Sequence, residues 1–342
     1  MGGHFCGHSS GRAVHCAPHD AQRRPHRQTA DIAGARQRCA RGLAHIGVIR
    51  CLEARGYDVG YIAGTSVGAL VGGIYAAGRL DTYESWAREL TRRDMLRLLD
   101  FSFRRGAIIK GDKVIDAICE LVGDANIEQL AVGFTAVATD MLDQSEVWLS
   151  RGSLFNAIRA STAIPTLISP LRINGRLLAD GGLVNPLPIA PTLNHGGALI
   201  VAVDLNGPRE GLATGEASTP DPETEPEPES SGKSGYARAI AEFVDKLTPS
   251  RDGSSGKDDE PGFLQMSTQT IEIMQNAIAR LKLAAYRPDM VISVPRDVCQ
   301  FWEFDRAAEM IDIGYERAER AIRNYQRSGA HPIAFSASSG KA

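Results

Sequence analysis

Ser66 is the residue of this chain that is best placed for nucleophilic chemistry. It is the centre of Gly64-Thr65-Ser66-Val67-Gly68, which follows a short β-rich run and opens a small-residue helix that ends at Gly78. A strand, a Gly-X-Ser-X-Gly turn and a helix together form the context of a nucleophile elbow, a tight and strained turn that glycines permit. The start of the helix directs N–H groups at the position where an oxyanion would form. Outside this context, the same five residues would be an ordinary Gly/Ser-rich turn.

A serine nucleophile needs a base, and histidine is scarce where one would be required. Of the eight histidines, only His45 and His195 lie between residue 40 and the C-terminal tail. The helical surroundings of His45 favour a packing role, and His195 precedes two glycines, as at the C-cap of a helix. A Ser-His-Asp triad stays open, but a carboxylate with suitable geometry could serve as the base instead.

Asp180 is the carboxylate whose position suits that role. It ends the β-rich run Arg176–Asp180 and is followed at once by Gly181, Gly182 and a proline-punctuated loop. This arrangement presents a side chain at the carboxyl edge of a sheet, where open α/β folds bind ligands. Taken alone, Asp-Gly-Gly is also a common turn.

Four motifs occur in the order of one known family. They are Ala40–Ile49 (ARGLAHIGVI), the elbow at Ser66, Arg159–Pro165 (RASTAIP) and Asp180-Gly181-Gly182. From about Ala40 to Asp204 the chain resembles the bacterial patatin-like phospholipases, most closely the RssA-like branch. The resemblance implies an α/β fold of three layers, with a mostly parallel central sheet, helices on both faces and a C-terminal helix-and-strand appendage.

The resemblance also implies a reaction. In the family, the elbow serine and the aspartate of the Asp-Gly-Gly/Ala motif form a dyad without histidine, so Ser66 is expected to be the nucleophile and Asp180 the base. The implied activity is hydrolysis of phospholipids or other acyl esters through an acyl-Ser66 intermediate. No metal or organic cofactor is implied, and an acyl-ester substrate would bring transient contact with a membrane surface.

The sequence departs from the family where the oxyanion hole should be. The family places a glycine-rich loop after its first strand, and here only Arg41 and Gly42 match the end of that motif, as a remnant of it. Arg36–Cys39 stand where the preceding glycines belong, and Met1–Cys39 contains no Leu, Lys, Glu, Tyr or Trp. We therefore expect no strand before Ala40, although the fold needs one at its centre.

A shifted reading frame explains this segment better than a disordered basic extension does. One permitted coding of Arg27–Cys39, read one base later, gives Ala-Arg-Pro-Pro-Ile-Ser-Leu-Ala-Leu-Gly-Ser-Gly, an apolar strand with a glycine loop in register with Ala40. The hypothesis predicts a single-base insertion or deletion near the codon for Cys39. The chain as written would lack oxyanion donors, which leaves open an alternative: a catalytically impaired patatin-fold protein that regulates or binds partners.

Composition narrows the function classes. With 342 residues and 43% hydrophobic content the chain can bury a sizeable core, and its net charge of −3 gives no reason to expect nucleic-acid binding. Beyond the first 39 residues, the cysteines are Cys51, Cys119 and Cys299, which are widely separated, as in a reducing cytoplasm. No run of 18 apolar residues is present. We expect a cytoplasmic protein, with peripheral membrane contact open for the basic and apolar segment Phe101–Gly111.

Changes in composition suggest five regions. We expect an atypical segment over 1–39, which is disordered or frame-shifted, and a catalytic core over 40–206. An acidic, largely disordered insertion rich in Pro, Ser and Gly follows over 207–262, with a short helix at Tyr236–Leu247. A helix-strand-helix region over 263–328 and a tail over 329–342 complete the chain. Helical spacing predicts two apolar faces packed on the core: Ile271, Met274, Ile278, Leu281 and Ala285 in one helix, and Met310, Ile313, Ala321 and Ile322 in the last.

Overall fold

The computed structural model describes residues 29–34, 39–91, 94, 112–165, 168–195, 199–208, 263–299 and 303–329. Several expectations therefore lie outside the described residues. They concern the basic segment Phe101–Gly111, nearly all of the acidic insertion, the helix Tyr236–Leu247 and the first 28 residues.

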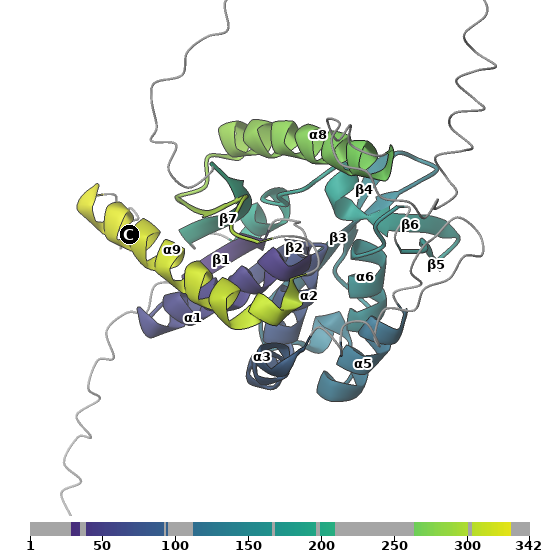
Figure 1. Cartoon of the computed structure of the whole chain (residues 1–342), viewed down its shortest axis with the longest axis horizontal. Helices are drawn as coiled ribbons and strands as arrows, with labels where there is room; N and C mark the ends of the chain where they lie inside the picture. The colour runs from purple at the N-terminus through teal and green to yellow at the C-terminus, as the bar shows by residue number, and fades with distance from the viewer. Residues whose placement is uncertain are drawn as a thin grey trace, which may run out of the picture.

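One mostly parallel sheet organises the fold, as predicted (Figure 1). The pairs β1–β2, β1–β7, β2–β3 and β7–β8 are parallel, whereas β3–β4, β3–β6 and β5–β6 are antiparallel. In sheet order the strands are β5 (Leu171–Ile173), β6 (Arg176–Asp180), β3 (Gly133–Asp140), β2 (Asp58–Thr65), β1 (Thr29–Gly34), β7 (Leu199–Gly207) and β8 (Met290–Pro295), with β4 (Ser145–Leu149) also paired to β3.

The central strand β1 corrects the expectation that no strand precedes Ala40. It pairs with β2 on one side and β7 on the other, and Ala30, Ile32 and Ala33 are buried. This strand could not be recognised in the sequence, because Thr-Ala-Asp-Ile-Ala-Gly has few β-forming residues and contains an aspartate. That aspartate, Asp31, is only 2% exposed in the structure. Pairing with two neighbouring strands outweighs such a weak local preference.

Helices lie between most of the strands along the chain. The α-helices are α1 (Ala44–Ala54), α2 (Val67–Ala76), α3 (Leu80–Glu89), α5 (Asp112–Val122), α6 (Leu154–Ser161), α8 (Phe263–Tyr286) and α9 (Ala307–Arg327). Short 3-10 helices are η1 (Cys39–Leu43), η2 (Ile127–Gln129), η3 (Gly181–Leu183), η4 (Ala190–His195) and η5 (Phe304–Arg306).

Alternating strand residues hold the three layers together. Ile32 and Val201 join the larger core, which includes buried residues of α1, α2 and α9. The next residues along each strand, Ala33 and Ala202, face the other side and pack with Ala279 of α8. Figure 1 shows α8 above the strands and α1, α2 and α9 below them, so helices cover both faces of the sheet, as predicted.

Only one of the two C-terminal helices buries the apolar face that the sequence predicts. In α9, Met310 and Ile322 are fully buried, which confirms the predicted core face of this helix. In α8, however, Met274 and Leu281 are among the exposed large apolar residues, so the predicted core face is wrong there. The face of α8 that packs on the protein instead contains Gln275 and Ala279.

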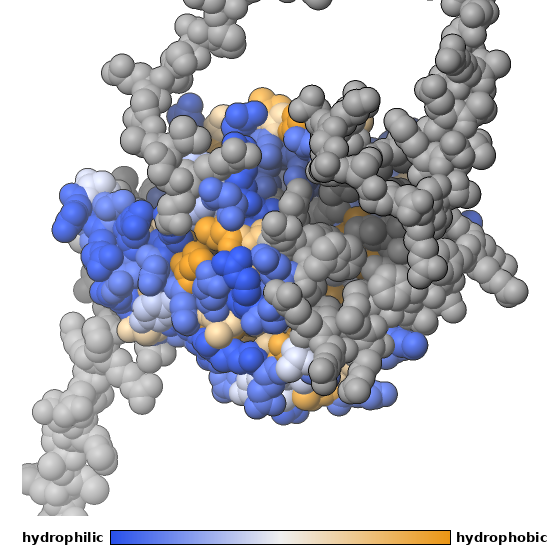
Figure 2. Space-filling model, in the orientation of Figure 1, coloured by the Kyte–Doolittle hydropathy of each residue, from blue (hydrophilic) through white to orange (hydrophobic). Residues whose placement is uncertain are grey.

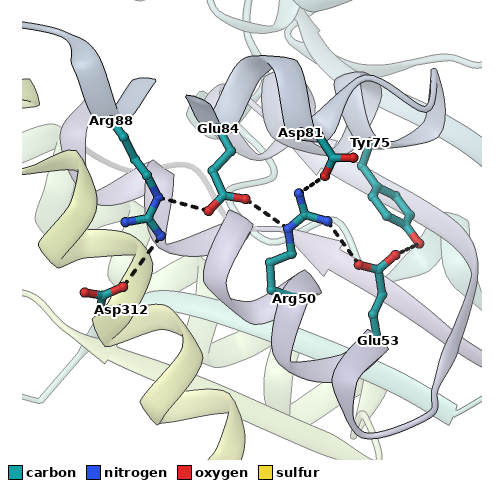
Figure 3. Close-up of polar contacts among 7 residues, drawn as sticks. All are labelled: Arg50, Glu53, Tyr75, Asp81, Glu84, Arg88 and Asp312. Carbon is teal, nitrogen blue, oxygen red and sulfur yellow. Dashed lines mark hydrogen bonds and ion pairs between the residues drawn. The ribbon is translucent and has the colours of Figure 1, made fainter. Parts of the chain in front are cut away.

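A network of charged side chains links the outer surfaces of the helices below the sheet (Figure 3). Arg50 of α1 lies at its centre: its Nε donates to Glu84 Oε2 at 2.9 Å, and it also pairs with Asp81 of α3. Arg88 Nε donates to Glu84 Oε1 at 3.0 Å and lies 3.6 Å from Asp312 of α9. Because several members are well exposed, each pair contributes little to stability, and the network serves mainly to fix how the helices pack together.

Candidate active site

The turn at Ser66 has the strained geometry of a nucleophile elbow. Ser66 lies between β2 and α2 with φ 55° and ψ −123°, a conformation that non-glycine residues rarely adopt. Its carbonyl accepts the first helical bond of α2, from Leu70 N–H at 3.0 Å. A Cβ atom at Gly64 would collide with Gly68 O and Ala69 N, so the first glycine of the motif is required for the close approach of strand and helix.

The strand register places Asp180 next to the elbow, on one edge of β3. Thr65 of β2 pairs with Val137 of β3, and the next β3 residue, Ala138, pairs with Asp180 of β6. Because β4 pairs with both Val137 and Ala138 on the opposite edge of β3, β2 and β6 follow one another along the same edge. Ser66 and Asp180 are both almost completely buried. The two residues selected from the sequence are therefore neighbours at the point where the ends of β2 and β6 meet.

A buried serine that the sequence analysis did not single out connects the elbow to β3. The Ser161 hydroxyl accepts a hydrogen bond from Ser66 N–H at 2.9 Å and donates to Val137 O at 2.6 Å. Ser161 is the last residue of α6 and has no exposed surface. It lies within the Arg159–Pro165 motif, so position in a family motif was the available signal, but its contact with the nucleophile could not be read from the sequence.

Hydrogen bonds fix the backbone and one carboxylate oxygen of Asp180. Its N–H donates to Ala163 O at 2.9 Å, and its carbonyl accepts from Thr139 Oγ1 at 2.8 Å. Gly182 N–H donates to Asp180 Oδ1 at 2.8 Å, which caps η3. The residue between them, Gly181, passes so close to Val137 O that any side chain would collide with it.

Asn185 ties the loop after Asp180 to both the elbow strand and α8. Its carbonyl accepts from Thr65 Oγ1 at 3.0 Å, and its buried side-chain amide donates to Glu146 Oε2 at 2.7 Å. The same carboxylate oxygen lies 3.8 Å from Lys282 Nζ of α8. The helix above the sheet is thus connected through Glu146 to the loop that carries Asp180.

The remnant of the expected glycine loop, Arg41 and Gly42, lies beside the elbow. Gly42 of η1 is packed so tightly on Val67 that a Cβ atom there would collide with it. The buried Arg41 side chain turns away, and its Nη1 donates to Arg296 O at 2.5 Å. Burial raises the pKa of nearby Asp204, and the positive charge of Arg41 opposes that rise. Residues 35–38, where further oxyanion donors were expected, lie outside the described residues.

The two histidines of the chain's body lie in different surroundings. His45 is buried on α1, where a Cβ atom at Gly34 would lie 3.4 Å from its Cε1, and it lines a small apolar cavity with Gly68. Its burial agrees with the packing role that we expected. His195 is the last residue of η4, which agrees with the predicted end of a helix.

Comparison with known proteins places this geometry in a family context. The family model described as patatin-like phospholipase matches residues 39–193, which include Ser66 and Asp180 but not β1. An uncharacterized NTE family protein of Mycobacterium tuberculosis is 39% identical over 331 residues, covering 84% of this chain and 89% of its own.

More distant relatives match about half of the chain's length. Neuropathy target esterase sws of Drosophila melanogaster is 32% identical over 48% of this chain and 12% of its own length. Lysophospholipase NTE1 of Saccharomyces cerevisiae is 32% identical over 48% of this chain and 10% of its own. The solved structure of VipD from Legionella pneumophila covers 88% of this chain and 67% of its own, at 13% identity and a TM-score of 0.42, too low to carry an argument about the site.

Proposed function

The chain belongs to the patatin-like phospholipase family, and we propose that it is a serine lipid acyl hydrolase with Ser66 as nucleophile and Asp180 as base. Membership supports a lipid esterase or hydrolase in general. The observation that favours this dyad is the register at β3, which brings a strained elbow serine and a buried aspartate together on one edge of that strand. The RssA-like branch stays a prediction, as does a phospholipid rather than another acyl ester as the substrate.

The proposed reaction proceeds in two halves. Ser66 Oγ attacks the ester carbonyl carbon while the Asp180 carboxylate takes the hydroxyl proton, and the tetrahedral intermediate then expels the alcohol, which receives that proton. Water attacks the acyl-serine in the same way, releasing the fatty acid and restoring Ser66. Since Ser66 N–H is bonded to Ser161, the oxyanion would be met by the next N–H groups of α2 and, in the re-framed chain, by the glycine loop before Arg41.

A second candidate is a catalytically impaired protein that regulates or binds a partner. It is favoured by one feature, the Arg36-Gln37-Arg38-Cys39 sequence that stands where the family has its glycine loop. Under this alternative the elbow and Asp180 would persist as structure without an assembled oxyanion hole. The frame-shift hypothesis reconciles both candidates, because it places the glycine loop in the gene but not in the chain as written.

Labelling with a fluorophosphonate probe tests the proposed dyad directly. An activated serine attacks phosphorus and displaces fluoride, whereas an ordinary serine does not react, so we expect one label on Ser66, located by peptide mass spectrometry. Pretreatment with heat should remove the labelling. A folded chain that takes up no label would favour the impaired alternative, and a label on another serine would refute the assignment of Ser66.

Ser161 should be a positioning residue for the nucleophile. In Ser161→Ala, the buried Ser66 N–H loses its acceptor, which costs about 1–3 kcal/mol, and we expect kcat on a p-nitrophenyl ester to fall roughly tenfold with KM little changed. Thr192→Ala is a matched control, because the buried Thr192 hydroxyl in η4 donates to Ile189 O, just before that helix. The control should lower Tm without lowering kcat. Equal kcat values in the two variants would show that Ser161 has only a structural role.

A further inference from the structure

The outer face of α8 is an exposed apolar stripe. Four large apolar residues lie along it, and their exposed fractions are 56% for Met266, 62% for Ile273, 57% for Met274 and 69% for Leu281. At 3.6 residues per turn, the spacings of seven and eight residues return these side chains to the same side of the helix. Figure 2 shows apolar surface at the upper edge of the molecule, over α8.

The positions between these residues keep the stripe free of charge. Thr270, Ala277, Ala284 and Ala285 are other exposed residues on this side, and exposed Gln269 lies at its border. The charged residues of α8 lie off the stripe: Arg280 is exposed at its border, whereas Glu272 and Lys282 are partly buried. Beyond the end of the helix, exposed Arg287 and exposed Asp289 have opposite charges. The exposed charge that borders the stripe on α8 itself is therefore basic, which complements an anionic surface.

The opposite face of α8 covers the proposed active site. Ala279 packs with Leu187 and Ile189 of the loop that follows Asp180, and the helix also contacts η3 directly. Beside α8, Trp148 is 42% exposed, and its indole N–H donates at 3.1 Å to Glu146, the partner of Lys282. An amphipathic ring anchored at its polar edge is typical of side chains at a lipid–water interface. One helix thus bears an apolar outer surface and an inner surface that contacts the Asp180 loop.

We infer that this stripe (Met266, Ile273, Met274 and Leu281) is the surface by which the protein docks on lipid, an inference that rests on the proposed acyl-ester hydrolase function. A helix lying in the plane of a membrane buries one apolar face to the depth of the headgroup boundary. Met266 to Leu281 spans about 22 Å along such a plane at 1.5 Å per residue. Protein interfaces rely on aromatic and arginine anchors at their centre, whereas the centre of this stripe consists of methionine, aliphatic and alanine side chains. Among the described residues, no helix is long and apolar enough to cross a membrane.

Vesicle co-sedimentation tests the inference with the full chain in a Ser66→Ala background, so that no lipid is hydrolysed. The vesicles contain phosphatidylglycerol and phosphatidylcholine in equal parts. We expect the parent to bind and Ile273→Asp/Leu281→Asp to lose at least tenfold in binding, because two apolar insertions are replaced by charges. Both side chains are more than half exposed, so folding should be retained. Met266→Asp/Met274→Asp, an independent pair on the same stripe, should lose binding as well.

Two matched controls isolate the apolar contact. Ile273→Leu/Leu281→Met keeps the stripe apolar and should bind like the parent. Asn324→Asp/Gln326→Glu adds the same two negative charges on exposed positions of α9 and should also leave binding nearly unchanged.

A parent that does not bind vesicles, or a stripe variant that binds as well as the parent, would overturn the inference. A parent that is dimeric by light scattering, with a monomeric stripe variant, would identify the stripe as a contact between copies and would overturn it too.

The outcome is separable from that of the proposed function. With Ser66 intact, the stripe variants should hydrolyse a short, soluble p-nitrophenyl ester at the parent rate while losing activity on vesicles. If the parent binds vesicles but hydrolyses neither substrate, the hydrolase assignment fails and the docking surface stands. If the soluble ester is hydrolysed and vesicle binding is absent, the docking surface fails alone.

Discussion

Replacing Ser66 with alanine should lower kcat/KM for p-nitrophenyl butyrate by roughly 10⁴- to 10⁶-fold. The Oγ atom is the nucleophile of the first proposed half of the reaction and the leaving group of the second, so no acyl-enzyme can form without it. The substitution removes one atom from a fixed turn whose backbone N–H is held by Ser161. Fold and Tm should therefore change little, and circular dichroism checks that point. Steady-state hydrolysis of the soluble ester, with purified parent and variant, is the measurement.

Asp180→Asn completes the test of the dyad. Asparagine keeps an oxygen that can accept the hydrogen bond from Gly182 N–H, so η3 should remain capped, but the amide cannot take the Ser66 proton. We expect a loss comparable to that of Ser66→Ala, and the double variant should be no worse than either single one, because the two residues act as a unit. Ser328→Ala, which removes an exposed hydroxyl bonded to Tyr325 O, is the serine control and should retain full activity. Comparable rates in Ser66→Ala and the parent would place the nucleophile elsewhere.

The parts of the fold that could be predicted are those with a strong local pattern. The elbow combines a β-rich run, two required glycines and a small-residue helix, so Ser66 could be found without coordinates. Asp180 was identifiable because a strand ends on it and two glycines follow. The last helix, α9, carries clear helical spacing, so its buried face with Met310 and Ile322 could also be predicted.

What the sequence could not show depends on contacts between distant segments. Ser161 bonds to Ser66 N–H across 95 positions of the chain, and only the packing of α6 against β3 reveals that contact. The orientation of α8 was mispredicted because both of its faces contain apolar residues: helical spacing found a stripe at Met274 and Leu281, but the sheet binds the side with Ala279. Periodicity identifies an apolar face without saying what covers it, and two residues of the predicted face, Met274 and Leu281, belong to the exposed stripe instead.

The prediction that no strand precedes Ala40 was wrong for a different reason: the residues of β1 are not typical of a central strand. Asp31 is 2% exposed in the middle strand of a parallel sheet, where near-continuous apolar runs are the rule. Burying a carboxylate in such surroundings carries a desolvation cost. Read one base later, the permitted coding places isoleucine at this position and a glycine loop at residues 36–38. An isoleucine at this position would match the apolar character of the neighbouring parallel strands.

A chain in which Met1–Cys39 is replaced by the re-framed strand and glycine loop should hydrolyse p-nitrophenyl butyrate about 10²- to 10³-fold faster than the chain as written. The physical reason is the return of backbone N–H donors to the oxyanion, since removal of even one such donor costs about this factor. The gain should vanish when Ser66→Ala is added, because the loop can only stabilise an intermediate that the serine forms. Sequencing the gene around the codon for Cys39 checks the frame itself.

Asp31→Ile in the otherwise unchanged chain separates the strand from the loop. It replaces the buried carboxylate with the residue of the shifted frame, and thermal unfolding checks that the fold is retained. It supplies no oxyanion donor, so kcat/KM should stay near the value of the chain as written. If Asp31→Ile alone restored hydrolysis, the defect would lie in the stability of the sheet rather than in the oxyanion hole. If the re-framed chain were no more active than the written one, the N–H donors to the oxyanion would already be present elsewhere. The residues of α2 that follow Ser66 would then have to stabilise the oxyanion by themselves.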